Sequence, residues 1–142
     1  MNATWYSNAL WLAGIGHFVI LAASIQVPFR LRWQEDLTKL IPFNRKLMWT
    51  YGFFTVMTIV AFGVLTLVLH AELLHGDRAA LGVAAFIGVY WTARVLVDLC
   101  YFRHSDWPGG PQFVIGHILL TSLFVALAAT YAGLVLWHLW LH

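Results

Sequence analysis

The sequence has few charged residues and almost no cysteine. Asp, Glu, Lys and Arg make up 10% of its 142 residues, whereas a soluble globular protein carries roughly 25%. Cys100 is the only cysteine, so no disulfide can form within one chain. No Lys or Arg precedes Arg30, so the basic region of a cleavable secretory signal is lacking. These absences argue against a soluble or disulfide-rich secreted domain, and we expect the first apolar segment to be retained.

Long apolar segments make up most of the sequence, in which 61% of the residues are hydrophobic. A helix needs about 20 apolar residues to cross a hydrocarbon core of ~30 Å. Four segments meet this length: residues 7–27, 47–69, 79–102 and 111–140. The sequence therefore predicts an all-α, integral membrane four-helix bundle that forms a single transmembrane domain over residues 1–142.

The cations predict how this bundle is oriented. Five of the eight Lys and Arg residues lie between the first two spans: Arg30, Arg32, Lys39, Arg45 and Lys46. Arg103 lies between the last two spans, and Arg78 alone lies between the second and third. Cytoplasmic loops carry an excess of Lys and Arg, so we expect both termini on the outer side of a bacterial inner membrane.

The first loop, residues 29–46, has an amphipathic pattern. Trp33, Leu37, Leu40 and Ile41 recur at helical spacing, with charged residues between them. Such a segment can form an interfacial amphipathic helix whose basic residues meet anionic lipid, or it can be a solvated connector. The sequence leaves both interpretations open. It favours the lipid bilayer over a nucleic acid as the partner of these cations.

Polar residues occur inside the predicted spans, where an ionisable side chain costs roughly 2.5–3.5 kcal/mol. Arg94 and Asp98 are one helical turn apart, so they can form an ion pair on one face. We expect such faces, including a hydroxyl stripe of Tyr51, Thr55, Thr58 and Thr66, to point into the bundle. The pair is either structural or part of a path that conducts protons or a solute.

Two histidines stand in identical contexts, Ile15-Gly16-His17 and Ile115-Gly116-His117. Imidazole is a common axial ligand of haem held between helices, and a preceding glycine leaves space for a flat macrocycle. His17 and His117 are therefore candidate ligands of haem b or another tetrapyrrole, bound without covalent attachment, or part of a quinone-linked electron carrier. Alternatively, both histidines form hydrogen bonds with threonine or backbone oxygens across helices.

A second group of histidines is predicted at the outer membrane face. His138 and His142 are four residues apart and can reach one metal ion, while His70 and His75 follow the second span. His70, His138 and His142 are thus candidate ligands for copper or zinc. An ordinary interfacial role for these histidines is the alternative.

The sequence lacks the motifs of common enzymes. It has no phosphate-binding loop, no dinucleotide fingerprint, no His-Glu-x-x-His and no nucleophile elbow. The predicted loops are short, and small residues on the first and fourth spans allow close helix contact. We therefore expect an accessory subunit that packs against other membrane proteins or against itself, rather than an enzyme.

The first loop and the second span carry a resemblance to known proteins. The segments are Val27-Pro28-Phe29-Arg30-Leu31-Arg32-Trp33 and Pro42-Phe43-Asn44-Arg45-Lys46-Leu47-Met48-Trp49. They resemble a family of small bacterial four-span membrane proteins, to which the third and fourth spans are less similar. The resemblance implies the four-span topology and a bacterial inner membrane, and it brings no activity with it.

Overall fold

The computed structural model describes residues 3–106 and 108–141. Within these ranges the chain forms helices and no strands. In chain order the elements are α1 (Ala3–Ile25), α2 (Val27–Arg30), α3 (Trp33–Asp36), the 3-10 helix η1 (Leu37–Lys39), α4 (Pro42–Val68), α5 (His70–His75), α6 (Arg78–Cys100), the 3-10 helix η2 (His104–Asp106) and α7 (Pro111–Leu141). The predicted all-α fold is confirmed for the described residues.

Four helical segments are long and apolar enough to cross a membrane: residues 4–30, which join α1 to α2, and the helices α4, α6 and α7. Large apolar side chains lie exposed along the outside of each of them. Water would penalise so much exposed apolar surface, whereas lipid tails would not. The predicted multi-pass membrane architecture is therefore confirmed at the level of four helices that can span a bilayer.

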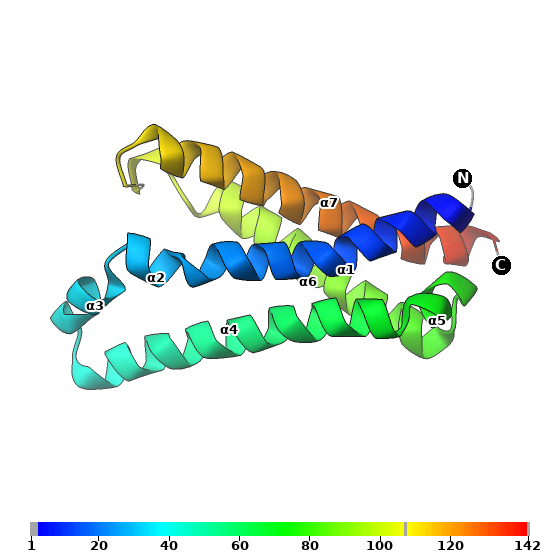
Figure 1. The fold of residues 1–142 in the computed structure, drawn as a ribbon, viewed down its shortest axis with the longest axis horizontal. Helices are drawn as coiled ribbons and strands as arrows, with labels where there is room; N and C mark the ends of the chain where they lie inside the picture. The colour runs from blue at the N-terminus through cyan, green and yellow to red at the C-terminus, as the bar shows by residue number, and fades with distance from the viewer. Residues whose placement is uncertain (1–2, 107, 142) are drawn as a thin grey trace.

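The helices are arranged as two pairs. α1 packs along α4, and α6 packs along α7, while α1 and α7 join the pairs. Figure 1 shows α1 between α4 and α7, with α6 crossing behind α1 at an angle. Both ends of the chain lie with α5 at one end of the bundle, and α2, α3 and the α6–α7 connection lie at the other. We call the former the terminal end and the latter the basic end.

Two of the helix boundaries that differ from the predicted spans involve proline. α4 begins at Pro42, earlier than residue 47, because proline fits the first turn of a helix, where its missing N–H is not needed. The first span was predicted to end at residue 27, but Pro28 lies in the first turn of α2, and the chain stays helical to Arg30. The break falls at Gln26 instead.

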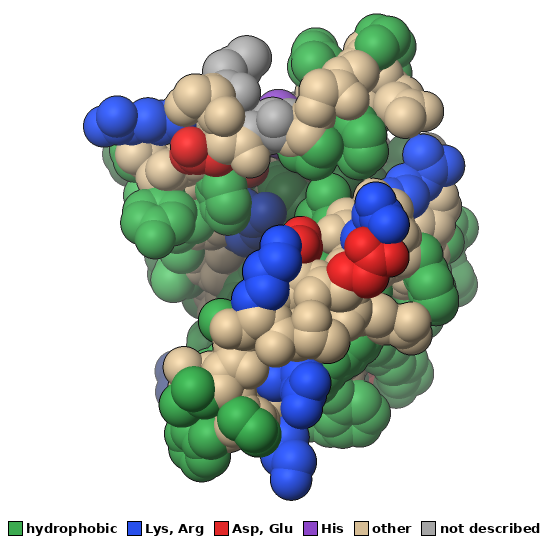
Figure 2. Space-filling view, turned by 90° about the vertical axis from the view of Figure 1, so that its left-hand side faces the viewer, with side chains coloured by type: hydrophobic (Ala, Val, Ile, Leu, Met, Phe, Trp, Pro, Cys, Tyr) green, Lys and Arg blue, Asp and Glu red, His purple; other side chains and the backbone are tan. Residues whose placement is uncertain are grey.

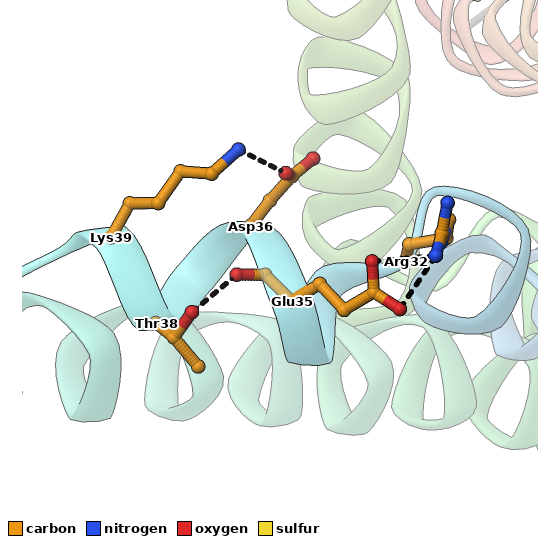
Figure 3. A network of polar contacts seen from close by, with 5 residues as sticks. All are labelled: Arg32, Glu35, Asp36, Thr38 and Lys39. Atoms are coloured by element: carbon orange, nitrogen blue, oxygen red, sulfur yellow. Dashed lines mark hydrogen bonds and ion pairs between the residues drawn. The ribbon is translucent and has the colours of Figure 1, made fainter.

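The segment from α2 to η1 is not one continuous helix. Arg32 has a left-handed backbone, with φ of 53°, and this conformation interrupts the helix between α2 and α3. Figure 3 shows the local contacts that follow, Arg32 with Glu35 at 2.7 Å and Lys39 with Asp36 at 2.9 Å. The hydrogen bond from Lys39, and its charge, lower the pKa of the Asp36 carboxyl. All of these groups face solvent at the basic end.

Several fully buried residues of the core lie toward the terminal end, among them Leu10, Leu73 and Leu134. Tyr6 stacks on Trp137, with ring centroids 4.7 Å apart, and its hydroxyl donates to the carbonyl of Gly133 at 3.2 Å. Thr66 and Tyr131 are fully buried and share a hydrogen bond of 2.5 Å between α4 and α7. Each buried hydroxyl therefore has a partner on a neighbouring helix, as burial in a low-dielectric interior requires.

Candidate functional site

His17 lies at the centre of the bundle, where it is fully buried. Its Nδ1 lies 2.7 Å from the carbonyl oxygen of Ala13, and the indole N–H of Trp91 lies 3.0 Å from its Nε2. Because an indole nitrogen can only donate, Nε2 accepts and the proton sits on Nδ1. His17 is thus a neutral imidazole with both ring nitrogens bonded, and it links α1 to α6.

This arrangement tests the predicted haem ligation by His17. A ring nitrogen whose lone pair accepts a hydrogen bond cannot also bind iron. The space around the ring is filled by Trp91, Phe62 and Tyr131, whose ring centroids lie 5.6, 6.0 and 5.9 Å from that of the imidazole. The residues around His17 do not fit a macrocycle. The hydrogen bonds of His17 also differ from the predicted alternative, because the backbone oxygen belongs to its own helix and the partner across helices is the indole of Trp91.

The second polar cluster joins α6 to α7 nearer the basic end. Asp98 is nearly buried, and its Oδ2 accepts a hydrogen bond of 2.5 Å from the hydroxyl of Thr121. The same oxygen lies 3.4 Å from Nε2 of His117, and the other, Oδ1, lies 3.5 Å from Nη1 of Arg94. The side chains of Arg94, His117 and Thr121 therefore meet at one carboxylate.

Local helix geometry explains this meeting. Arg94 and Asp98 are one turn apart on α6, and His117 and Thr121 are one turn apart on α7. Residues at this spacing share a helix face, so the packing of α6 along α7 brings the two pairs together. The structure unites Arg94, Asp98 and His117 in this way, and His17 has none of them among its contacts.

A cavity of about 890 Å³ opens beside this cluster. Residues of α1 and α2 form one wall, and residues of α6 and α7, with Asp106 and Pro108, form the other. Figure 2 shows the basic end hollowed between these parts of the chain, with lysine and arginine side chains below the hollow. Arg94, Asp98 and His117 lie on the cavity wall, where apolar side chains predominate.

Gly16 and Gly116, each predicted to leave space beside a histidine, lie in different surroundings. A Cβ on Gly16 would lie 3.4 Å from a methyl carbon of Leu123, so this glycine serves the contact between α1 and α7. A Cβ on Gly116 would have no atom within 4 Å, and Gly116 lines the cavity. The space that was expected beside both histidines exists only beside His117.

The predicted hydroxyl stripe of α4 does not face the interior at Tyr51 and Thr55. Tyr51 is 61% exposed, and the hydroxyl of Thr55 donates to the carbonyl of Tyr51 in its own helix at 2.8 Å. A threonine that bonds to the preceding turn can face lipid without an unpaired donor. The expectation that the stripe points inward was wrong for these two residues and is confirmed for Thr66, which is fully buried.

Two of the histidines at the terminal end, His70 and His138, have different neighbours. Nε2 of His70 lies 3.3 Å from the hydroxyl of Ser7, and His138 is buried against Gly76. His142 lies outside the described residues. Among residues 3–106 and 108–141, no three His, Cys, Asp or Glu side chains lie close enough together to hold a metal ion.

Trp91 is the residue that sequence reasoning missed. Tryptophan favours the membrane interface, yet Trp91 lies in the interior of α6 and is almost fully buried. A mid-span tryptophan needs an acceptor for its N–H, so its position was a signal that a buried acceptor faces it. Its ring also stacks on Phe124 at 5.0 Å, and Phe124 in turn contacts Arg94.

Comparison of the chain with known protein families, curated proteins and solved structures found no match.

Proposed function

We propose that this protein is a multi-pass membrane protein that binds an amphipathic molecule from the bilayer in the cavity beside Arg94, Asp98 and His117. The observation that carries the proposal is the composition of this cavity, which combines apolar walls with one cluster of ionisable groups. Binding sites for small molecules typically have this composition. The polar head of the ligand would meet the cluster, and its apolar part would lie along the walls.

A conducting role for Arg94 and Asp98 has less support. Between this cluster and the terminal end lie His17, Trp91 and Tyr131, each at most 1% exposed. Their polar atoms bond to one another or to neighbouring helices. A proton or solute path would need these packed side chains to separate, whereas a binding site open on one side needs no such change.

Solvent extraction of the purified protein, followed by mass spectrometry, tests the proposal. Gly116→Leu places an apolar side chain on the cavity wall, at a position where a Cβ would meet no atom within 4 Å. Gly82→Leu is the matched control, since Gly82 is equally open and lies on α6 outside the cavity lining. We expect a co-purified amphiphile in the wild type and in Gly82→Leu, and at least a several-fold loss in Gly116→Leu. Equal amounts in all three proteins would contradict the proposal.

The optical spectrum of the same samples addresses the predicted tetrapyrrole. His117 lies on the cavity wall, whereas His17 has both ring nitrogens bonded, so a haem with two histidine ligands is not the ligand that we propose. We expect no Soret band. A Soret band that disappears in His117→Ala would replace the proposed amphiphile with a singly ligated tetrapyrrole.

We also propose that the protein acts as an accessory subunit within a larger membrane assembly, or with copies of itself. The shortness of the connections supports this role: α5 and α6 are separated by only Gly76 and Asp77, and the α6–α7 connection spans residues 101–110. Such connections leave no space for a separate catalytic domain. Purification in mild detergent tests the role, and a monomer without any associated protein would contradict it.

For the orientation, we propose that the basic end faces the cytoplasm of a bacterial cell and that the α2–η1 segment lies in the headgroup layer. The cations of this end support the proposal, because cytoplasmic loops are enriched in Lys and Arg. Trp33 packs against Trp49 at 5.7 Å, at the level where tryptophan meets an interface. A cysteine placed at Thr38 should react with membrane-impermeant reagents only in inverted vesicles, and labelling in intact spheroplasts would reverse the orientation.

A further inference from the structure

The acids that line the cavity are already engaged by the protein. Both oxygens of Asp98 have partners, as described above. Asp106 accepts the backbone N–H of Arg103 at 3.1 Å through Oδ2 and the hydroxyl of Ser105 at 3.4 Å through Oδ1. A ligand in the cavity therefore meets two carboxylates whose oxygens already bind donors of the protein.

The arginines of the same cavity are in the opposite situation. Arg94 makes no hydrogen bond within the described residues; its Nη1 lies only in ion-pair range of Asp98, at 3.5 Å. The guanidinium lies over the ring of Phe124 at 5.0 Å and that of Phe102 at 5.9 Å, and 38% of the side chain is exposed. Arginine carries five N–H donors, and the buried Nη1 of Arg94, a residue of the cavity lining, has no hydrogen-bond partner among the described residues. Arg30, at the rim, uses its Nε for Gln26 at 3.2 Å.

From this asymmetry we infer that the ligand is an anionic amphiphile whose phosphate or carboxylate head binds the guanidinium of Arg94 and whose acyl chain follows the apolar wall. The inference rests on the proposed function and specifies its ligand class. A charge-assisted hydrogen bond to guanidinium is stronger than one between neutral groups.

A neutral head such as a quinone fits the cluster less well. It would accept hydrogen bonds from Arg94, whose ion-pair partner Asp98 also binds Thr121 and His117. An anionic head adds a second negative group to which the guanidinium can donate. The apolar lining, which includes Val19, Leu119 and Leu123, favours a head that carries a hydrocarbon chain over a free anion.

Thermal unfolding of the full chain in a neutral detergent tests this inference, because a ligand that binds the folded state raises the unfolding midpoint. The probes are phosphatidylglycerol, phosphatidylcholine, inorganic phosphate and a short-chain quinone. We expect phosphatidylglycerol to act at a concentration at least about tenfold lower than phosphatidylcholine or the quinone, and inorganic phosphate to have no effect.

The other outcomes separate the two proposals. Equal action of phosphatidylglycerol and phosphatidylcholine, or stronger action of the quinone, would overturn the anionic head and leave the proposed function standing. Stabilisation by inorganic phosphate alone would replace the amphiphile with a free anion. No stabilisation by any amphiphile would contradict both proposals.

Substitutions of single arginines show where on the protein phosphatidylglycerol binds. Arg94→Gln should abolish the preference for phosphatidylglycerol, and Arg94→Lys should retain part of it. Arg45→Gln is the control for lipid bound at the basic surface, because Arg45 lies outside the cavity lining. Loss of the preference in Arg45→Gln, with Arg94→Gln unaffected, would assign the lipid to the surface. The comparison of lipids in the wild type tests the inference even where a variant does not fold.

Discussion

The two Ile-Gly-His sequences of this chain lie in opposite environments. His17 is fully buried, with both ring nitrogens bonded to Ala13 and Trp91, while His117 lies partly exposed on a cavity wall beside Asp98. The difference arises from their neighbours: α6 presents a tryptophan to one imidazole and a carboxylate to the other. Identical local sequence thus gives a closed, structural half of the bundle toward the terminal end and an open half toward the basic end.

Replacing each histidine with alanine should give the largest difference in unfolding free energy between the two halves. His17→Ala removes two buried hydrogen bonds and leaves a cavity and an unpaired indole N–H, so we expect a loss of about 3 kcal/mol in the free energy of unfolding. His117→Ala, at a partly exposed position, should lose about 1 kcal/mol or less. Reversible unfolding in detergent measures both, and equal losses would show that the halves do not differ.

Glycines provide the next contrast. A Cβ on Gly63 would lie 2.9 Å from the ring of Phe18 and 3.2 Å from Cβ of His17, whereas one on Gly116 would meet no atom within 4 Å. Gly63→Ala should therefore force α1 and α4 apart and cost about 1–3 kcal/mol in the same unfolding measurement. Gly116→Ala should be neutral. An unchanged free energy of unfolding in Gly63→Ala would mean that the closed half accommodates the added methyl group without strain.

Thr121→Val examines the polar cluster of the open half. The variant keeps the shape of the side chain and removes the hydroxyl that donates to Asp98, so we expect a loss of about 1 kcal/mol in unfolding free energy. Ser122→Val is the control, because its hydroxyl bonds to the carbonyl of Ile118 in its own helix. A loss for Ser122→Val as large as that for Thr121→Val would remove any special role of the bond to Asp98.

The smallest effect is expected at the solvent-exposed η1 segment. Lys39→Ala removes the hydrogen bond and charge that lower the pKa of Asp36, so the pKa of this carboxyl should rise toward its usual value. A carboxyl with a lowered pKa contributes stability that is lost as the pH falls through that pKa. Because both groups are fully exposed, we expect no measurable change in unfolding at neutral pH. NMR titration of Asp36 measures the shift, which Lys46→Ala should leave unchanged.

The sequence predicts much of this fold because the bilayer imposes strong rules. Segment length and apolar composition predict four helices, and the cost of burying charge places Arg94 and Asp98 on one interior face. Helical spacing likewise pairs His117 with Thr121. These inferences use contacts within one helix, which follow from the backbone geometry alone.

Contacts between helices could not be predicted from the sequence, because they depend on helix order and rotation. The meeting of Asp98 with Thr121, and the bond from Trp91 to His17, both cross between helices. Helix rotation also decides which glycine packs against a neighbour and which lines a cavity. The orientation of the exposed α4 hydroxyls was predicted wrongly for a different reason. A threonine hydroxyl can donate to a backbone carbonyl of its own helix, as Thr55 does.

The most direct measurement of the contrast between the halves is NMR of the chain with ¹⁵N-labelled histidine imidazoles, with and without phosphatidylglycerol. The signals of His17 and His117 are assigned through His17→Ala and His117→Gln. We predict that the lipid shifts the signals of His117 and leaves those of His17 at the values of a neutral ring protonated at Nδ1. Unchanged His117 signals at saturating lipid, or a shift confined to His17, would contradict the assignment of binding to the open half.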